Sequence, residues 1–295
     1  MTRVAVIGTG RMGGAMAKAL ARGGLPPVLC NRTRDRAVAL ASEIEGAQVV
    51  DTPADAARAA DVVITMLADD AAVSSVYGEL APAARTESVF VDMSTVMPTT
   101  IREVAPAIRA AGAGILDAPV SGSVQLAEAG QLTVMVGGEA ADLARARPAL
   151  ELLAKATFHM GPLGSGAAMK LAVNTVIFGL NEALAEGLVL AEAAGVDRAR
   201  AYEVLAASAV GAPYVGYKRA AFLEPDRTPA AFALALAEKD LDLITGFADR
   251  LGVQLPQAHV NRHVVREAGA ASSPERDFST VADHLRSLQR EGIRT

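Results

Sequence analysis

The sequence has few of the residues that mark several classes of protein. Its 295 residues include no tryptophan and a single cysteine, Cys30, so no internal disulfide forms and we expect a buried thiol in a reducing compartment. Aromatic residues make up only 4% of the chain and its net charge is −5, which argues against a nucleic-acid surface. The N-terminus lacks a basic segment followed by an apolar one, so we expect a cytoplasmic protein.

The longest apolar run extends from residue 161 to residue 194. It predicts a helix on the order of 45 Å long, buried on most sides and long enough to join two domains. Asn174, Asn181 and Glu182 interrupt the run, so a membrane span is not expected. Lys170 and Asn174 share one helix face. Burial favours the neutral amine of a lysine, which suits it to exchange a proton with a substrate oxygen; the alternative is a side chain that reaches solvent.

A glycine-rich motif near the N-terminus predicts a dinucleotide site. A buried strand at 3–7 continues into Gly8-Thr9-Gly10-Arg11-Met12-Gly13, and a helix follows. In this context the first glycine allows a tight turn and the second lets a pyrophosphate approach. The third lets helix and strand pack closely, with the helix N-terminus facing the anion.

The next strand, 27–30, favours one of the two nicotinamide cofactors. It ends at Asn31-Arg32-Thr33, with Arg34 and Arg36 close by, where an NAD site would place an acidic residue. A guanidinium binds the 2′-phosphate of NADP, whereas a carboxylate would repel it. We therefore expect NADP as the preferred cofactor and NAD as the second candidate. A solvated basic helix start is the alternative for Arg36.

The order of elements predicts an α/β fold: an N-terminal Rossmann-type doubly wound sheet followed by an all-α C-terminal domain, joined by a long interdomain helix. Further strands are expected at 47–50, 61–67, 88–93, 114–120, 132–138 and 156–159. Beyond residue 166 every segment predicts a helix: 166–194, 197–208, 213–223, 229–251, 256–268 and 278–290. The expected domains are an NADP-binding domain at 1–162 and a helical substrate and dimerisation domain at 163–295.

Loops at the carboxyl ends of such strands bind ligands. Ala68-Asp69-Asp70, at the end of the strand expected at 61–67, should form the next loop over the cofactor. Ser94-Thr95 are candidates near the nicotinamide, with helix capping as the alternative. Ser121-Gly122-Ser123 offers hydroxyls and backbone N–H groups to a carboxylate, although a plain turn has the same composition. His259, His263 and Glu267 have a spacing that could hold a metal, but nothing else supports it, and no metal is expected.

Taken together, these motifs resemble the β-hydroxyacid dehydrogenase family, which includes 3-hydroxyisobutyrate dehydrogenase and glyoxylate/succinic semialdehyde reductase. The matching segments are GTGRMGGAMAKAL at 8–20, DMST at 92–95, DAPVSGSVQLAEAGQLTVMVGG at 117–138, GSGAAMKLAVN at 164–174 and EKDLDL at 238–243. They cover nearly the whole chain in the order and spacing of the family.

The resemblance implies roles for individual residues. Lys170 would be the catalytic lysine, Asn174 would position it and the substrate oxygen, and Ser121-Gly122-Ser123 would hold the substrate carboxylate. Thr95 and Lys239 would lie near the cofactor, with Lys239 also near the substrate. The full set expected at the cofactor is Gly8, Gly10, Arg11, Met12, Gly13, Asn31, Arg32, Thr33, Met66, Leu67, Ala68, Thr95 and Lys239.

The expected function is NAD(P)-dependent interconversion of a small β-hydroxy acid, of the 3-hydroxyisobutyrate type, and its semialdehyde or keto acid. Ser123, where many hydroxyisobutyrate enzymes have glycine, and Val173 before Asn174 resemble the glyoxylate/succinic semialdehyde branch instead. An imine reductase of the same architecture is an alternative, although those enzymes usually carry Asp or Tyr where Lys170 stands. A non-catalytic nucleotide-binding module is a second alternative. The long apolar helix further predicts a homodimer or homotetramer.

Overall fold

The computed structural model describes residues 2–292. The chain divides into two compact units, Met1–Lys170 and Leu171–Thr295. None of the described helices is both long enough and apolar enough to span a membrane.

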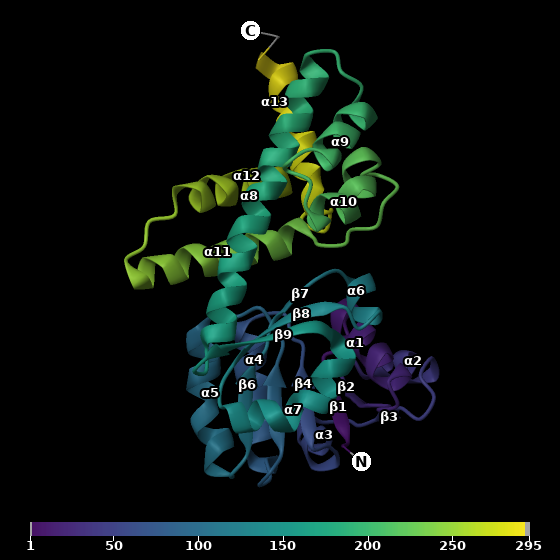
Figure 1. The fold of residues 1–295 in the computed structure, drawn as a ribbon, viewed down its shortest axis with the longest axis vertical. Coiled ribbons are helices and arrows are strands. Elements are labelled where there is room, and N and C mark those ends of the chain that lie inside the picture. The colour runs from purple at the N-terminus through teal and green to yellow at the C-terminus, as the bar shows by residue number, and fades with distance from the viewer. Residues whose placement is uncertain (1, 293–295) are drawn as a thin grey trace. The chain divides into compact units, whose positions relative to one another are not determined.

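The first unit is built on one mixed sheet, which in the described residues has nine strands (Figure 1). Strands β1 to β6 are parallel in the order β3-β2-β1-β4-β5-β6, and an antiparallel β8 follows, flanked by β7 and β9. The bounds are β1 Val4–Ile7, β2 Val28–Cys30, β3 Gln48–Val49, β4 Val62–Thr65, β5 Val89–Asp92, β6 Gly114–Asp117, β7 Val120–Ser121, β8 Leu132–Gly137 and β9 Ala154–Gly161. The chain reverses its direction of winding between β1 and β4, which is the topological switch point of such a sheet.

Helices cover both faces of this sheet (Figure 1). Alternate strand residues such as Val4 and Val6 pack with α1, α2, α6 and α7, whereas Ala5 and Ile7 belong to a second core with α3, α4 and α5. The bounds are α1 Arg11–Arg22, α2 Arg34–Ser42, α3 Pro53–Ala59, α4 Asp70–Leu80, α5 Pro98–Ala110, α6 Val124–Glu128 and α7 Ala140–Leu153. The predicted doubly wound sheet is therefore confirmed.

The second unit is helical. It begins within the long helix α8, Ser165–Ala193, whose first turns belong to the first unit. Its other elements are α9 Arg198–Ala207, α10 Pro213–Leu223, α11 Leu234–Leu251, α12 Pro256–Ala271, the 3-10 turn Phe278–Thr280 and α13 Val281–Gly292. Phe178, Phe232 and Phe278 pack together in its core, with ring centroids 5.2 to 6.4 Å apart. The predicted all-α C-terminal domain is also confirmed.

Most predicted elements differ from the structure by one to three residues at their ends, and two differ for a reason that the structure shows. The strand expected at 114–120 stops at Asp117 and resumes at Val120, because Pro119 has no N–H to donate to a ladder. The helix expected from 229 begins only at Leu234. Residues 231 and 232 donate their N–H groups to Asp277 instead, at 2.8 and 3.1 Å, so this segment stays extended beside residues 276–278.

Candidate active site

Neighbouring backbone leaves no room for a side chain at two of the three glycines in the loop after β1. Gly8 has a φ of +93°, and an added Cβ would lie 2.3 Å from the Met66 carbonyl oxygen. At Gly13 an added Cβ would lie 1.9 Å from the Gly8 carbonyl oxygen. At Gly10 an added Cβ would meet no atom within 4 Å. The middle glycine therefore leaves open space at the N-terminus of α1, and this cradle suits the pyrophosphate of a dinucleotide.

The end of β2 is tied to this loop through Asn31. Its side-chain oxygen accepts a hydrogen bond from the Thr9 N–H at 3.0 Å, and its amide nitrogen donates to the Thr33 carbonyl at 2.9 Å. Arg32 is exposed beside it, whereas Arg34 is paired with Asp51 at 2.6 Å. Asn31 thus shapes the loop, and Arg32 is the exposed cation that follows it directly in the chain.

A buried aspartate supports the loops after β4 and β5. Asp92 Oδ1 accepts hydrogen bonds from Thr65 Oγ1 at 2.7 Å and from Ser94 Oγ at 2.8 Å. Ser94 Oγ in turn accepts the Leu67 N–H at 2.9 Å. Burial raises the pKa of Asp92 to about 7, although the two hydroxyl bonds oppose the rise. Ser94 is 1% exposed, and its hydroxyl orders the loop at Leu67 through the bond from the Leu67 N–H.

A second buried aspartate holds the beginning of α8. Asp117 Oδ1 accepts the Gly164 N–H at 2.7 Å and Oδ2 accepts the Ala167 N–H at 2.6 Å. Burial raises the pKa of Asp117, against the effect of these bonds. Asp92 and Asp117 are partners in the register of β5 and β6, so the two carboxyls end adjacent strands. Neither carboxyl is among the functional residues that the sequence predicts.

The Ser121-Gly122-Ser123 segment is half-buried between β7 and α6. Ser123 caps α6 by accepting the Leu126 N–H at 3.3 Å. Gly122 has a φ of +146°, and an added Cβ would lie 2.8 Å from a Leu132 methyl carbon. The turn geometry therefore accounts for Gly122 and Ser123, while Ser121 is the hydroxyl of this segment that the cap does not use.

Helix α8 carries the two residues predicted to be catalytic. Lys170 is half-buried, not enclosed, and Asn174 is 4% exposed one turn later. The Asn174 amide nitrogen donates to Asp240 Oδ2 at 2.8 Å, and Asp240 Oδ1 is paired with Lys239 at 2.7 Å. The bond to Asp240 uses a donor of the Asn174 amide and fixes the orientation of the side chain. Asp240 belongs to the EKDLDL segment that the sequence analysis identifies, and in the structure it is the partner of Asn174 and Lys239.

Asn181 has a structural role. It is fully buried, donates to the Phe278 carbonyl at 3.3 Å and accepts from the Tyr214 hydroxyl at 2.7 Å. His263 pairs with Glu267 at 3.3 Å on the exposed side of α12, and His259 is exposed. Within residues 2–292 no three His, Cys, Asp or Glu side chains gather as metal ligands would.

Two family models match the chain in succession. The NAD binding domain of 6-phosphogluconate dehydrogenase matches residues 3–161. The model described as NAD-binding of NADP-dependent 3-hydroxyisobutyrate dehydrogenase matches residues 164–285.

Curated relatives and solved structures agree with these models. The chain is 31% identical to glyoxylate/succinic semialdehyde reductase 1 of Arabidopsis thaliana, over 96% of this chain and 98% of that protein. It is 34% identical to 3-hydroxyisobutyrate dehydrogenase of Pseudomonas aeruginosa, over 95% and 97%. The Mycobacterium tuberculosis 3-hydroxyisobutyrate dehydrogenase solved with L-serine superposes with a TM-score of 0.82 at 32% identity, over 97% and 99%. An imine reductase from Pseudomonas sp., at 22% identity and a TM-score of 0.66, shares the fold alone.

The ordered sequence motifs, the doubly wound sheet with its open glycine loop and the relatives matched from end to end agree with one another. The chain belongs to the β-hydroxyacid dehydrogenase family of NAD(P)-dependent oxidoreductases, the family of 3-hydroxyisobutyrate dehydrogenase and glyoxylate/succinic semialdehyde reductase.

Proposed function

We propose that the protein interconverts a small β-hydroxy acid and its semialdehyde or keto acid, with Lys170 as the general acid and base. The observation that carries the proposal is the pair Lys170 and Asn174 one turn apart on α8, with the Asn174 amide oriented by Asp240. A nucleotide-binding module that performs no chemistry needs neither a lysine nor a fixed amide at this place.

The proton chemistry belongs to the chain's own residues. When bound, the nicotinamide cofactor supplies the hydride in reduction and accepts it in oxidation. In reduction, the Lys170 ammonium gives its proton to the carbonyl oxygen as the hydride reaches the carbonyl carbon, so that an alcohol forms. In oxidation the neutral amine takes the hydroxyl proton back. Asn174 orients this oxygen, and Ser121 with the backbone of Gly122 and Ser123 holds the substrate carboxylate.

Replacing Lys170 with alanine tests this assignment. Loss of the proton-transfer group should lower kcat about 10²- to 10⁴-fold, while the affinity for NADPH stays unchanged. Lys155→Ala is the matched control, because Lys155 is an exposed lysine on β9. Steady-state turnover and NADPH fluorescence titration measure the two quantities. Wild-type turnover in Lys170→Ala would show that another group moves the proton.

The cofactor preference follows from the end of β2. We propose that Arg32 binds the 2′-phosphate, because it is exposed beside the glycine loop and no carboxylate occupies the position of Asn31. Arg32→Ala should weaken NADPH binding about 10- to 100-fold and leave NADH binding nearly unchanged, since a charge-assisted bond contributes about 1.5–3 kcal/mol. Arg34→Ala is the control, because Arg34 is paired with Asp51. Equal effects of both substitutions on NADPH would contradict the role of Arg32.

We expect the substrate in the reductive direction to be a small aldehyde acid or keto acid of the kind that the family uses. Turnover of glyoxylate, succinic semialdehyde, methylmalonate semialdehyde and tartronate semialdehyde, each with NADPH and NADH, would identify it. A cyclic imine belongs in the same panel, since preferential reduction of the imine would favour imine reductase chemistry. Nucleotide binding without turnover of any compound would favour the non-catalytic alternative.

We also propose that the protein is a homodimer or homotetramer. Ala172, Val176, Ala183 and Leu190 form one exposed, mostly apolar stripe along α8, and Val176 and Leu190 are 71% and 72% exposed. A second copy of the chain would cover such a stripe. Light scattering should give a multiple of the 30.3 kDa chain mass, and Leu190→Glu should shift it toward the monomer. A monomer at micromolar concentration would contradict the proposal.

A further inference from the structure

The segment that begins α8 is held by one buried carboxylate. Asp117, the last residue of β6 and 1% exposed, accepts the N–H of Gly164 through one oxygen and the N–H of Ala167 through the other. Ala167 lies in the first turn of α8, where N–H groups have no partner inside the helix. A negative charge at this end also interacts favourably with the helix dipole. Asp117 therefore joins the sheet directly to the helix.

The same junction is closely packed against β8. An added Cβ at Gly166 would lie 2.3 Å from the Met135 carbonyl oxygen, and at Gly137 it would lie 2.4 Å from Asp117 Oδ1. At Gly166 the first turn of α8 therefore packs directly against the backbone of β8, and at Gly137 the strand packs against the Asp117 carboxylate. The helix cannot move toward the sheet without a clash.

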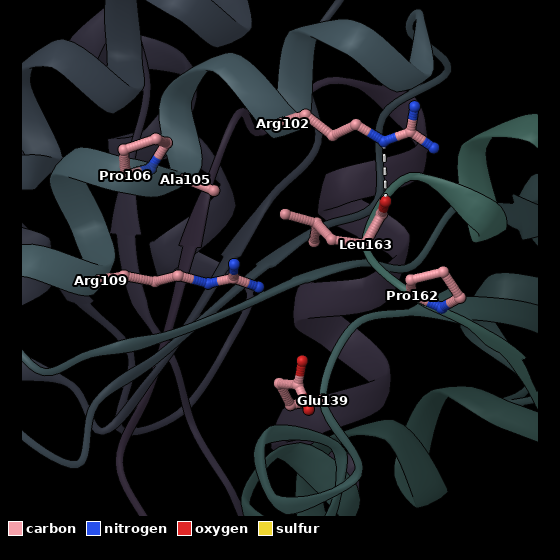
Figure 2. A pocket seen from close by; sticks show the side chains of 7 residues that line it. All are labelled: Arg102, Ala105, Pro106, Arg109, Glu139, Pro162 and Leu163. Atoms are coloured by element: carbon pink, nitrogen blue, oxygen red, sulfur yellow. Dashed lines mark hydrogen bonds between the residues drawn. The ribbon is translucent and has the colours of Figure 1, made fainter.

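A third contact comes from α5. Arg102 Nε donates to the Leu163 carbonyl oxygen at 2.9 Å (Figure 2). An added Cβ at Gly164 would lie 2.6 Å from the same nitrogen, so the guanidinium also lies against the residue that Asp117 binds. Arg102 and Arg109, both from α5, line a hollow of about 450 Å³, and Figure 2 shows how their side chains lie. Arg109 lines this hollow without a hydrogen bond to Leu163 in the view.

Lys170 lies three residues beyond Ala167, about 4.5 Å farther along the helix axis. It belongs to the same compact unit as the sheet and the glycine loop. We infer that Asp117, assisted by Arg102, is a positioning residue that sets where the helix presents Lys170 relative to the glycine loop. The inference rests on the proposed role of Lys170. A displacement of about 1 Å at such a group lowers the rate about 100-fold in other enzymes, so rigid anchoring of this turn has a direct effect on the rate.

Asp117→Asn is the primary test. The amide keeps the size of the carboxylate but places an N–H donor against a backbone N–H, so the first turn loses one of its two bonds. We expect kcat to fall about 10- to 100-fold, while KM and the Kd for NADPH change by less than about twofold. If Asp117 had a purely structural role, the substitution would lower the thermal stability but would not lower kcat while KM and the Kd for NADPH stay nearly unchanged.

Asp142→Asn is the matched control. Asp142 is also a buried aspartate that accepts a backbone N–H of β6, from Ile115 at 3.2 Å, but it lies on α7 and does not contact α8 through this bond. It should lower the thermal stability and leave kcat unchanged. Wild-type kcat in Asp117→Asn, or an equal loss of kcat in Asp142→Asn, would overturn the inference.

A second pair of variants decides the question if Asp117→Asn does not fold. Arg102 is exposed, so Arg102→Gln should fold, and the loss of its bond to Leu163 should lower kcat several-fold. Arg109→Gln, seven residues later on α5, should leave kcat unchanged. Equal kcat in both would overturn the inference. If Lys170→Ala keeps turnover, the proposed function falls and this inference with it; if Lys170→Ala is inactive and Asp117→Asn is fully active, only the positioning role is wrong.

Discussion

Replacing Asp92 with asparagine should make the protein more resistant to alkaline pH. Asp92 ends β5, is 1% exposed and accepts two hydroxyl hydrogen bonds through Oδ1, whereas Oδ2 has no hydrogen-bond partner among the described residues. Burial raises its pKa from 3.8 to about 7, and the neighbouring Asp117 adds to the rise. Asparagine preserves the acceptor for Thr65 and Ser94 but cannot ionise.

The size of the effect follows from linkage between protonation and folding. A pKa of 3.8 in the unfolded chain and about 7 in the native state corresponds to about 4 kcal/mol. The native state binds this proton more tightly than the unfolded chain does. The contribution of Asp92 to the free energy of unfolding is therefore fully present below pH 3.8 and is lost as the pH rises through 7. Between pH 5 and pH 9 the wild-type protein should lose about 3 kcal/mol through Asp92, and the variant should not.

Urea unfolding followed by circular dichroism at pH 5, 7 and 9 measures this difference. The free energy of unfolding of Asp92→Asn should gain about 3 kcal/mol relative to wild type across the range. Asp61→Asn is the control: burial raises the pKa of Asp61, but bonds from Arg3 and Arg85 outweigh burial and lower it. Asp61 titrates below pH 5. The difference in free energy of unfolding between Asp61→Asn and wild type should therefore stay constant from pH 5 to pH 9. A constant difference for Asp92→Asn would refute the reasoning.

Two further predictions concern the glycine loop and the helical unit. Gly10→Ala should weaken NADPH binding and preserve the melting temperature, because the added Cβ meets no atom within 4 Å, whereas Gly13→Ala should lower the melting temperature, because its Cβ would lie 1.9 Å from a carbonyl oxygen. Lys218→Met should cost about 3–5 kcal/mol in urea unfolding, because it leaves the buried Asp277 carboxylate without the cation 2.7 Å away. A loss below about 1 kcal/mol would mean that the backbone N–H groups on Asp277 suffice.

The parts of the fold that the sequence predicts correctly depend on local patterns. Short apolar runs ending in glycine or polar residues predict the strands, and the position of Gly8, Gly10 and Gly13 between a strand and a helix predicts the dinucleotide loop. These signals need only a few consecutive residues. They identify the family because several of them occur in a fixed order.

The residues that organise the site escape such patterns because their partners are distant in the sequence. Asp117 binds Gly164 and Ala167, which lie 47 and 50 residues away, and Asn174 binds Asp240, 66 residues away. The sequence does contain one usable signal: two buried strands each end in aspartate, and parallel strands present their carboxyl ends at one edge of the sheet. Once the structure shows that β5 and β6 end at Asp92 and Asp117 and pair with each other, that rule accounts for the two carboxyls lying side by side.

Helix α8 shows where an apolar pattern is insufficient. The pattern predicts a helix buried on most sides, yet Val176 and Leu190 are more than two-thirds exposed. An apolar pattern in the sequence indicates that side chains are buried, but it does not show what buries them. A surface that packs within the same chain and a surface that packs against a second copy have the same pattern. The polar residues of the same helix distinguish the face that packs within the chain from the face that does not. Asn181 is buried and bonded within the chain, whereas Glu186, three residues after Ala183 of the stripe, is exposed beside it. The stripe therefore lies outside the packed core of its own unit.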